Sequence, residues 1–183
     1  YLWGISMDSD PKVAEDIYNR LVSVGWVEAY DMLGMMFCYD KKGVKVNDAE
    51  NFKTGYSYFM KGAELGEPGC MQSLAFIYQY GFNGKPNINV AIRWFNRAAQ
   101  AGLRSAYFNL GYIYYYGEGE ISQDNNKAWE YFKVGAEKHN SWDSYYMMAL
   151  MYHDGNAPKE ITEYDVINYY QEVVFGGSRF AGE

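Results

Sequence analysis

Apolar and small residues recur at helical spacing between residues 105 and 116, where Ala106, Leu110 and Tyr114 stand four residues apart. This spacing is typical of an α-helix that buries one face. The glycine-rich stretch 117–119 interrupts the pattern and predicts a turn. We therefore expect a helix over 105–116 that ends at this turn.

A second helix is expected directly after the turn, over residues 125–138. Its buried stripe is formed by Ala128, Phe132 and Ala136, which again stand four residues apart. Asp124 precedes this helix and is a suitable N-cap, because its carboxylate can accept a hydrogen bond from a free backbone N–H. The two segments predict a pair of antiparallel helices whose apolar stripes face each other.

The same pattern recurs along the chain with a period of about 36 residues. One aromatic position recurs with spacings of 36 and 37 residues, at Phe59, Phe95 and Phe132. One small position recurs with spacings of 41, 36 and 38 residues, at Gly34, Ala75, Gly111 and Ala149. A fixed period in this range indicates a stack of helix pairs that works through an extended surface.

The period divides the chain into units, and we expect residues 1–183 to form one repeat array. Four helix pairs are expected over 28–66, 69–102, 105–139 and 142–177, with a partial unit over 1–25 and the start of another over 178–183. We interpret the chain as a fragment of a longer array. In the unit 69–102 the helices are expected over 71–80 and 90–101, with Gly102 as a left-handed residue after the second.

Small residues are expected where paired helices cross, because only they allow a close approach. Gly34, Ala75, Gly111 and Ala149 have this role in the first helix of each pair, and Ala63, Ala99 and Ala136 in the second. A larger ring then fills the space between the helix pairs. We assign that role to Phe59, Phe95, Phe132 and Tyr170.

Charge and composition exclude several classes of function. The net charge is −7 and the pI about 4.9, which argues against nucleic-acid partners because phosphate recognition needs clustered Lys and Arg. No run of about 18 apolar residues occurs, so we expect no membrane insertion. Two cysteines do not form a disulfide framework.

Motifs in the best-defined unit resemble the Sel-one-like repeat, a relative of the tetratricopeptide repeat. The matching residues are Leu110-Gly111, Tyr114, Gly117-Glu118-Gly119, Asp124, Lys127-Ala128, Tyr131-Phe132 and Ala136-Glu137. The resemblance covers nearly the whole chain and implies an all-α fold, a right-handed superhelical solenoid of antiparallel helix pairs. It also implies a scaffold or adaptor role, without a cofactor. The chain departs from the family pattern at Gly55, at Val173-Val174 and at His139.

Candidate chemistry is sparse. Cys38 and Cys70 are offset by about nine residues along parallel helices, roughly 13 Å, which is too far for a disulfide. We expect two free, buried thiols. His139 and His153 are the only histidines, and no spacing typical of a metal site accompanies them.

The 20 tyrosines are the best indication of function. In tetratricopeptide-like stacks the first helices line the concave face, at positions three before and one, four and five after the crossing residue. The resemblance therefore predicts a tyrosine-rich groove formed by Gln72, Phe76, Gln79, Tyr80, Phe108, Tyr112, Tyr115, Tyr116, Tyr146 and His153, with Leu150 and Asp154 at the remaining positions of the last unit. Tyr112 and Tyr115 are the first choices for contact residues. The alternative is that half of these rings pack sideways between helices.

We expect a protein-interaction scaffold whose groove binds a peptide or a helix of a partner protein. Further repeats or domains of the same polypeptide are also expected partners. One alternative is a passive spacer or regulatory segment of a larger protein, which needs no exposed aromatic surface. A more distant alternative is an acid/base hydrolase using His153, Asp154 and scattered carboxylates.

Overall fold

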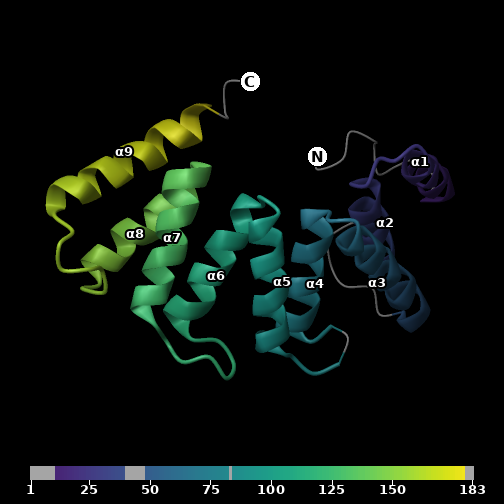
Figure 1. Ribbon diagram of the computed structural model, residues 1–183, viewed down its shortest axis with the longest axis horizontal. Helices are drawn as coiled ribbons and strands as arrows, with labels where there is room; N and C mark the ends of the chain where they lie inside the picture. Colours follow the sequence, from purple (N-terminus) through teal and green to yellow (C-terminus); the bar gives the residue numbers. More distant parts are fainter. Residues whose placement is uncertain (1–10, 40–47, 83, 180–183) are drawn as a thin grey trace. The chain divides into compact units, whose positions relative to one another are not determined.

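The computed structural model describes residues 11–39, 48–82 and 84–179, and side chains of residues 12–175 within those ranges. The described residues form nine α-helices and no β-strand, so the all-α prediction is confirmed (Figure 1). The helices are α1 Pro11–Ser23, α2 Ala29–Cys38, α3 Ala49–Glu64, α4 Pro68–Tyr80, α5 Ile88–Gln100, α6 Arg104–Tyr116, α7 Asn125–His139, α8 Trp142–His153 and α9 Glu163–Arg179. The expected beginning of the partial first unit, residues 1–10, and residues 180–183 lie outside the described part.

The chain divides into two compact units, residues 1–86 and 87–183. In the first unit α2 packs on α3 and α3 on α4, while α1 packs on α2. In the second unit each helix from α5 to α9 packs on the next one in the chain. Consecutive antiparallel packing of this kind is the arrangement that the repeated sequence pattern predicts.

Helix boundaries follow the caps that the sequence supplies. α6 and α7 lie within one residue of their predicted ranges, and the carboxylate of Asp124 accepts from the backbone N–H of Lys127 at 3.0 Å. α4 begins three residues earlier than predicted because the Glu67 side chain accepts from two backbone N–H groups of its first turn. Gly102 has a φ of 92°, which confirms its place as the residue that ends the preceding helix.

The crossing glycines have the predicted role. A Cβ on Gly111 would lie 2.5 Å from Cε1 of Phe132, and a Cβ on Gly34 would overlap the ring of Phe59 in the same way. Both rings are completely buried. The missing side chain on the first helix therefore makes room for the ring from the second.

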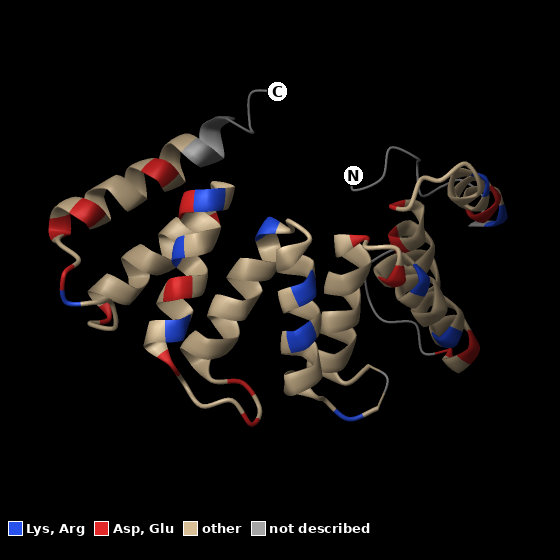
Figure 2. Ribbon diagram, viewed as in Figure 1, with Lys and Arg blue, Asp and Glu red and all other residues tan. Residues whose placement is uncertain are grey.

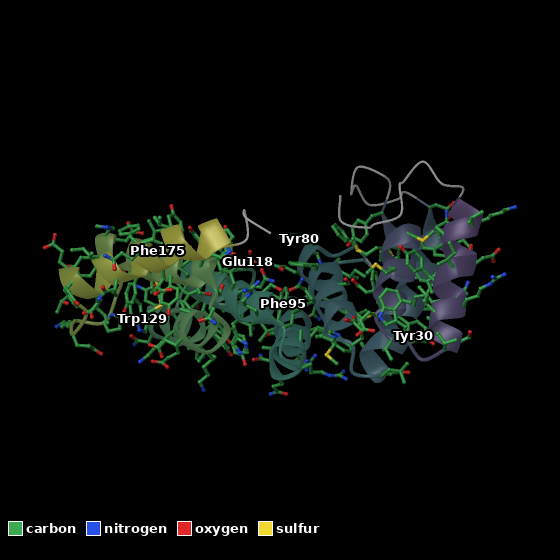
Figure 3. The ribbon with its side chains drawn as sticks, turned by 90° about the horizontal axis from the view of Figure 1, so that it is seen from above. Tyr30, Tyr80, Phe95, Glu118, Trp129 and Phe175 are labelled. Carbon is green, nitrogen blue, oxygen red and sulfur yellow. The ribbon has the colours of Figure 1, made fainter. Side chains whose placement is uncertain are left out.

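Tyr170 does not take the buried place that the pattern predicts. Its side chain is 39% exposed, and its ring lies 6.0 Å from that of His153. Ile167 and Phe175 on the same helix are exposed as well, whereas Trp129 is buried inside the second unit (Figure 3). The prediction is wrong because no further described helix covers this face of α9.

Two departures from the family pattern have a structural reason. His139 continues α7 by one residue, and Asn140 takes the left-handed conformation with a φ of 49° in place of a glycine. Gly55 lies against α2, where a Cβ would come 2.5 Å from Sγ of Cys38 and 2.7 Å from the carbonyl oxygen of Gly34. An alanine does not fit at this position.

Cys38 and Cys70 form no disulfide and are buried, each against a glycine of α3. The Sγ of Cys70 fills the place of a Cβ on Gly62, as the side chain of Ser144 does at Gly135. The corresponding positions of the intervening repeat carry Ala98 and Ala106, both completely buried. At this contact between consecutive helices, a glycine on one helix is thus paired with a larger residue on the next, and an alanine with an alanine.

Candidate functional site

The first helices of the repeats carry almost no charge. Asp31 on α2, Arg104 on α6 and Asp143 on α8 are their only Asp, Glu, Lys or Arg residues, and α4 has none. Figure 2 shows α4, α6 and α8 almost entirely in the colour of uncharged residues. The candidate surface is therefore set by aromatic and amide side chains.

Three rings form a ladder along α6. Phe108 and Tyr112 lie 6.2 Å apart between ring centroids, and Tyr112 and Tyr116 lie 4.4 Å apart. Tyr112 is 39% and Tyr116 52% exposed, while Phe108 is half-buried against Phe132. Spacing of four residues places the rings on one face of the helix, so α6 presents two adjacent tyrosines to solvent.

Tyr115 differs from the groove expectation because its side chain is buried. Its ring belongs to the core cluster that includes Trp129 and Met148, and only 5% of its surface is exposed. The Tyr115 hydroxyl donates to Oδ2 of Asp154 at 2.5 Å. Burial raises the pKa of Tyr115, and the hydrogen bond to Asp154 acts in the same direction. Tyr115 is a core residue with a polar tip, as the sideways-packing alternative anticipates for some rings.

α8 contributes Tyr146, which is 50% exposed, and His153, which is exposed at the end of the helix. The imidazole of His153 lies 5.8 Å from the ring of Tyr152 and 6.0 Å from that of Tyr170. Leu150, at the position that corresponds to Tyr112, packs against the core cluster. Of the four positions predicted to face the groove in this repeat, the one at Leu150 therefore does not contribute an exposed side chain.

α4 carries the predicted residues of the first unit. Phe76 and Tyr80 are stacked with centroids 6.1 Å apart and an interplanar angle of 13°, and Tyr80 is 57% exposed. Phe82 continues this row 5.7 Å from Tyr80. Gln72 and Gln79 are half-buried. The predicted residues thus form one group on α4 in the first unit and another on α6 and α8 in the second.

An acidic cluster in the first unit was not predicted from the sequence. Asp31 stands three residues before Gly34, the position that Phe108 and Tyr146 occupy in their own repeats. Ligand atoms of Asp31, Glu67 and Cys70 lie within 4.8 Å of one another, the one such group among the described residues close enough to bind a metal ion. The sequence feature that could have indicated this cluster is Asp31, a charged residue at a position that is aromatic in the other two repeats named.

Three of the four carboxylate oxygens of this cluster have protein partners. Ser73 donates to Asp31 at 2.9 Å, and Glu67 accepts from the backbone N–H groups of Gly69 and Cys70. Burial raises the pKa of Asp31 to about 6; the Ser73 hydrogen bond opposes this shift and the Glu67 carboxylate adds to it. We interpret the cluster as a capping and packing device between α2 and α4.

The histidines do not combine with an acid–base or nucleophilic partner in the described residues. His139 stacks on Tyr107 with centroids 4.8 Å apart, and His153 contacts the two tyrosine rings described above. The described helices also include none with the length and hydropathy required to span a bilayer. What the geometry offers is an aromatic contact surface.

The Sel1 repeat pattern matches residues 27–67, 68–103, 104–140 and 142–163. These matches extend over most of the chain, and the chain belongs to the Sel1 repeat family. The family resemblance expected from the motifs around Gly111 and Phe132 is thereby confirmed.

Two solved structures share the fold. The Sel1 repeat protein from Oxalobacter formigenes gives a TM-score of 0.76 at 24% identity, covering 92% of this chain and 65% of that one. The protective antigen c5321 of uropathogenic Escherichia coli, described as having an SLR fold, gives 0.73 at 24% identity, covering 95% of this chain and 36% of that one. The solenoid fold class is confirmed by this likeness.

Relatives with assigned roles are much longer proteins. The chain is 30% identical over 131 residues to the chitin synthase regulator SKT5 of Saccharomyces cerevisiae, which corresponds to 69% of this chain and 18% of SKT5. It is 36% identical over 118 residues to activator of C kinase protein 1 of the same yeast, 61% of this chain and 19% of that protein. The chain thus spans about a fifth of each relative.

Proposed function

We propose that this chain is a protein-interaction module that binds a peptide or helical segment of a partner through the exposed aromatic face of its first helices. The exposed tyrosine pair of α6, Tyr112 and Tyr116, is the observation that carries the proposal. Tyr146 on α8 extends the contact surface in the same unit, and Tyr80 on α4 provides a corresponding surface in the other.

Exposed rings of this kind suit recognition for two reasons. A tyrosine offers a large contact area while losing few rotamers, and tyrosines are enriched among the residues that dominate binding energy. The ring contacts along α6 also restrain Tyr112 and Tyr116 before a partner arrives. Restraint in the free protein lowers the entropic cost of association.

The names of the two yeast relatives agree with this role. One is a regulator and the other an activator of an enzyme. The part of this chain that they match consists of Sel1 repeats. We extend to this chain the class of function, binding of a protein partner.

The test begins with a selection from a random-peptide phage library against the full 183-residue chain. Affinities of the selected peptides are then measured by fluorescence anisotropy for the unaltered chain and for Tyr112→Ala/Tyr116→Ala. Each tyrosine is expected to contribute about 2 kcal/mol or more if it is a hot spot. If the two losses add, the double variant should therefore bind about a thousandfold more weakly.

The matched control is Glu130→Ala/Lys133→Ala, which removes two exposed side chains of α7. It should leave the affinity within about twofold, and the circular dichroism melting curves of both variants should resemble that of the unaltered chain. Equal affinity of the tyrosine variant and the unaltered chain would contradict the proposal. A selection without binding peptides would instead favour a passive spacer.

A further inference from the structure

The chain already pairs several of its aromatic rings with its own cations. The Nζ of Lys127 lies 5.0 Å from the ring centroid of Tyr114, and Cζ of Arg97 lies 4.4 Å from that of Trp94. Such distances are within the range of a cation–π attraction. These two rings of the second unit are thus each covered by a lysine or arginine side chain.

The exposed tyrosines of α6 and α8 have no comparable cover among the described residues. Tyr112, Tyr116 and Tyr146 are 39%, 52% and 50% exposed, and the rings of Tyr112 and Tyr116 contact other aromatic side chains. Arg104, the one cationic residue of α6, lies at its opposite end, two turns or more before Tyr112. Their π faces remain available to a cation from outside.

Tyr115 links a carboxylate to this tyrosine pair. The ring of Tyr115 touches that of Tyr116, with centroids 4.9 Å apart, and its hydroxyl donates to Oδ2 of Asp154. Asp154 is exposed and forms no ion pair with a described Lys or Arg. It stands five residues after Ala149, as Tyr116 stands five after Gly111, so it belongs to the same face of its repeat.

We propose that the Tyr112–Tyr116 pair and Asp154 together form a receptor for an arginine side chain of the partner segment. The guanidinium would stack on the exposed tyrosine rings and donate to the free oxygen of Asp154, which the Tyr115 hydroxyl holds in place. This inference rests on the proposed function and adds the chemistry of the partner.

Two considerations favour arginine over lysine or a purely apolar ligand. A guanidinium is planar, so it can stack on a ring and donate to a carboxylate at the same time, whereas an ammonium acts as a point charge. The chain carries a net charge of −7, which attracts a cationic segment over longer distances. An uncharged ligand would leave the exposed Asp154 without a role in recognition.

The experiment uses a peptide from the phage selection and a synthetic copy in which its arginine is replaced by citrulline, which has the same shape without the charge. Both are titrated against the full chain, Asp154→Asn, and the control Glu160→Gln, which removes an equal charge from another exposed site. Asparagine can still accept from the Tyr115 hydroxyl, so the fold should be retained, as melting curves will verify.

A charged hydrogen bond typically contributes about 1.5–3 kcal/mol, which corresponds to roughly a tenfold to hundredfold change in affinity. We expect Asp154→Asn and citrulline each to weaken binding about tenfold or more, and the two changes together to add little further loss. Glu160→Gln should stay within about twofold. Selected peptides without arginine, or equal affinity for the citrulline peptide, would overturn the inference. In that case a loss of binding in Tyr112→Ala/Tyr116→Ala would still support the proposed function.

Discussion

The first and second helices of the repeats differ in the charge of the side chains they carry. α4 carries no Asp, Glu, Lys or Arg, and α6 carries only Arg104, whereas α7 alone carries Lys127, Glu130, Lys133, Glu137 and Lys138. Figure 2 shows this contrast between α6 and α7 directly. The exposed side of α6 is aromatic, and that of α7 is mixed in charge.

This difference separates two properties, solubility and strong contact with a partner, that are difficult to combine on one helix surface. Interspersed charges of both signs keep a surface soluble and give weak, salt-screened contacts. Exposed aromatic rings give strong contacts but also a tendency to associate. In α6 and α7 the rings and the charges lie on different helices, whereas α9 exposes rings as well, Tyr164 and Tyr170 among them.

The largest effect is expected where the two kinds of helix meet. Phe132→Ala removes a completely buried ring of α7 that fills the space over Gly111 of α6. Truncation of a buried phenylalanine typically costs about 3–5 kcal/mol of stability. Urea unfolding followed by circular dichroism measures the loss. An unchanged midpoint would mean that α6 and α7 do not pack through this ring.

A smaller effect is expected at the junction of α3 and α4. Gly62→Ala places a Cβ against Sγ of Cys70 and should cost about 1–3 kcal/mol through overpacking. Adding Cys70→Ala should restore part of that stability, because Ala98 and Ala106 occupy the corresponding positions of the next repeat, while the close approach to Cβ of Tyr30, at 2.9 Å, remains. A double-mutant cycle by urea unfolding gives the coupling. Additive losses would contradict the pairing of residue sizes at this contact.

Asp31 is the exception on the first helices and predicts a pH dependence. Burial raises its pKa from 3.8 to about 6, so the folded chain binds this proton more tightly than the unfolded chain. The resulting stabilisation is complete below about pH 4 and is lost as the pH rises through about 6. On its other sides, Glu67 and Cys70 face it from α4 and Tyr39 lies at the end of α2.

Asp31→Asn removes this titration and should raise stability near pH 7.5 by about 1–2 kcal/mol relative to the unaltered chain. Near pH 5 the difference should shrink, because Asp31 is then largely protonated. Urea unfolding at both pH values measures it. A difference that is larger near pH 5 than near pH 7.5 would show that Asp31 is stabilised as a carboxylate.

The smallest effect is expected on the charged surface itself. Lys133→Ala changes an exposed side chain of α7, and its effect on stability should remain within about 0.5 kcal/mol. Thermal melting at low and high salt is sufficient to measure this. A substantial loss would indicate that the charge of the second helices contributes to the fold, against the division described above.

The sequence determines much of this fold because period, caps and crossing residues agree with one another. Asp124 predicts the start of α7, Gly102 predicts the end of α5, and the pairing of Gly111 with Phe132 follows from the 36-residue spacing. Repeats support such predictions, because the same helix pair is specified by several segments of the sequence.

The candidate site could be predicted only in part. Helical position places Tyr112 and Tyr115 equally near the expected groove, but burial depends on neighbours that the spacing does not identify, here Trp129 and Met148. The prediction that Tyr170 is buried was wrong because burial requires a helix that covers this face of α9, and the described residues include none. The hydrogen bond from Ser73 to Asp31 joins two repeats and has no counterpart in the periodic pattern.

The central claim is that the aromatic face of the first helices, and not the charged face of the second, is where a partner binds. Hydroxyl-radical footprinting with mass spectrometry tests it directly on the chain with and without a saturating selected peptide. Tyr112, Tyr116 and Tyr146 should be protected, while Tyr164 on α9, which is 72% exposed, should be oxidised at an unchanged rate. Protection of Tyr164 with undiminished oxidation of Tyr112 and Tyr116 would contradict the account.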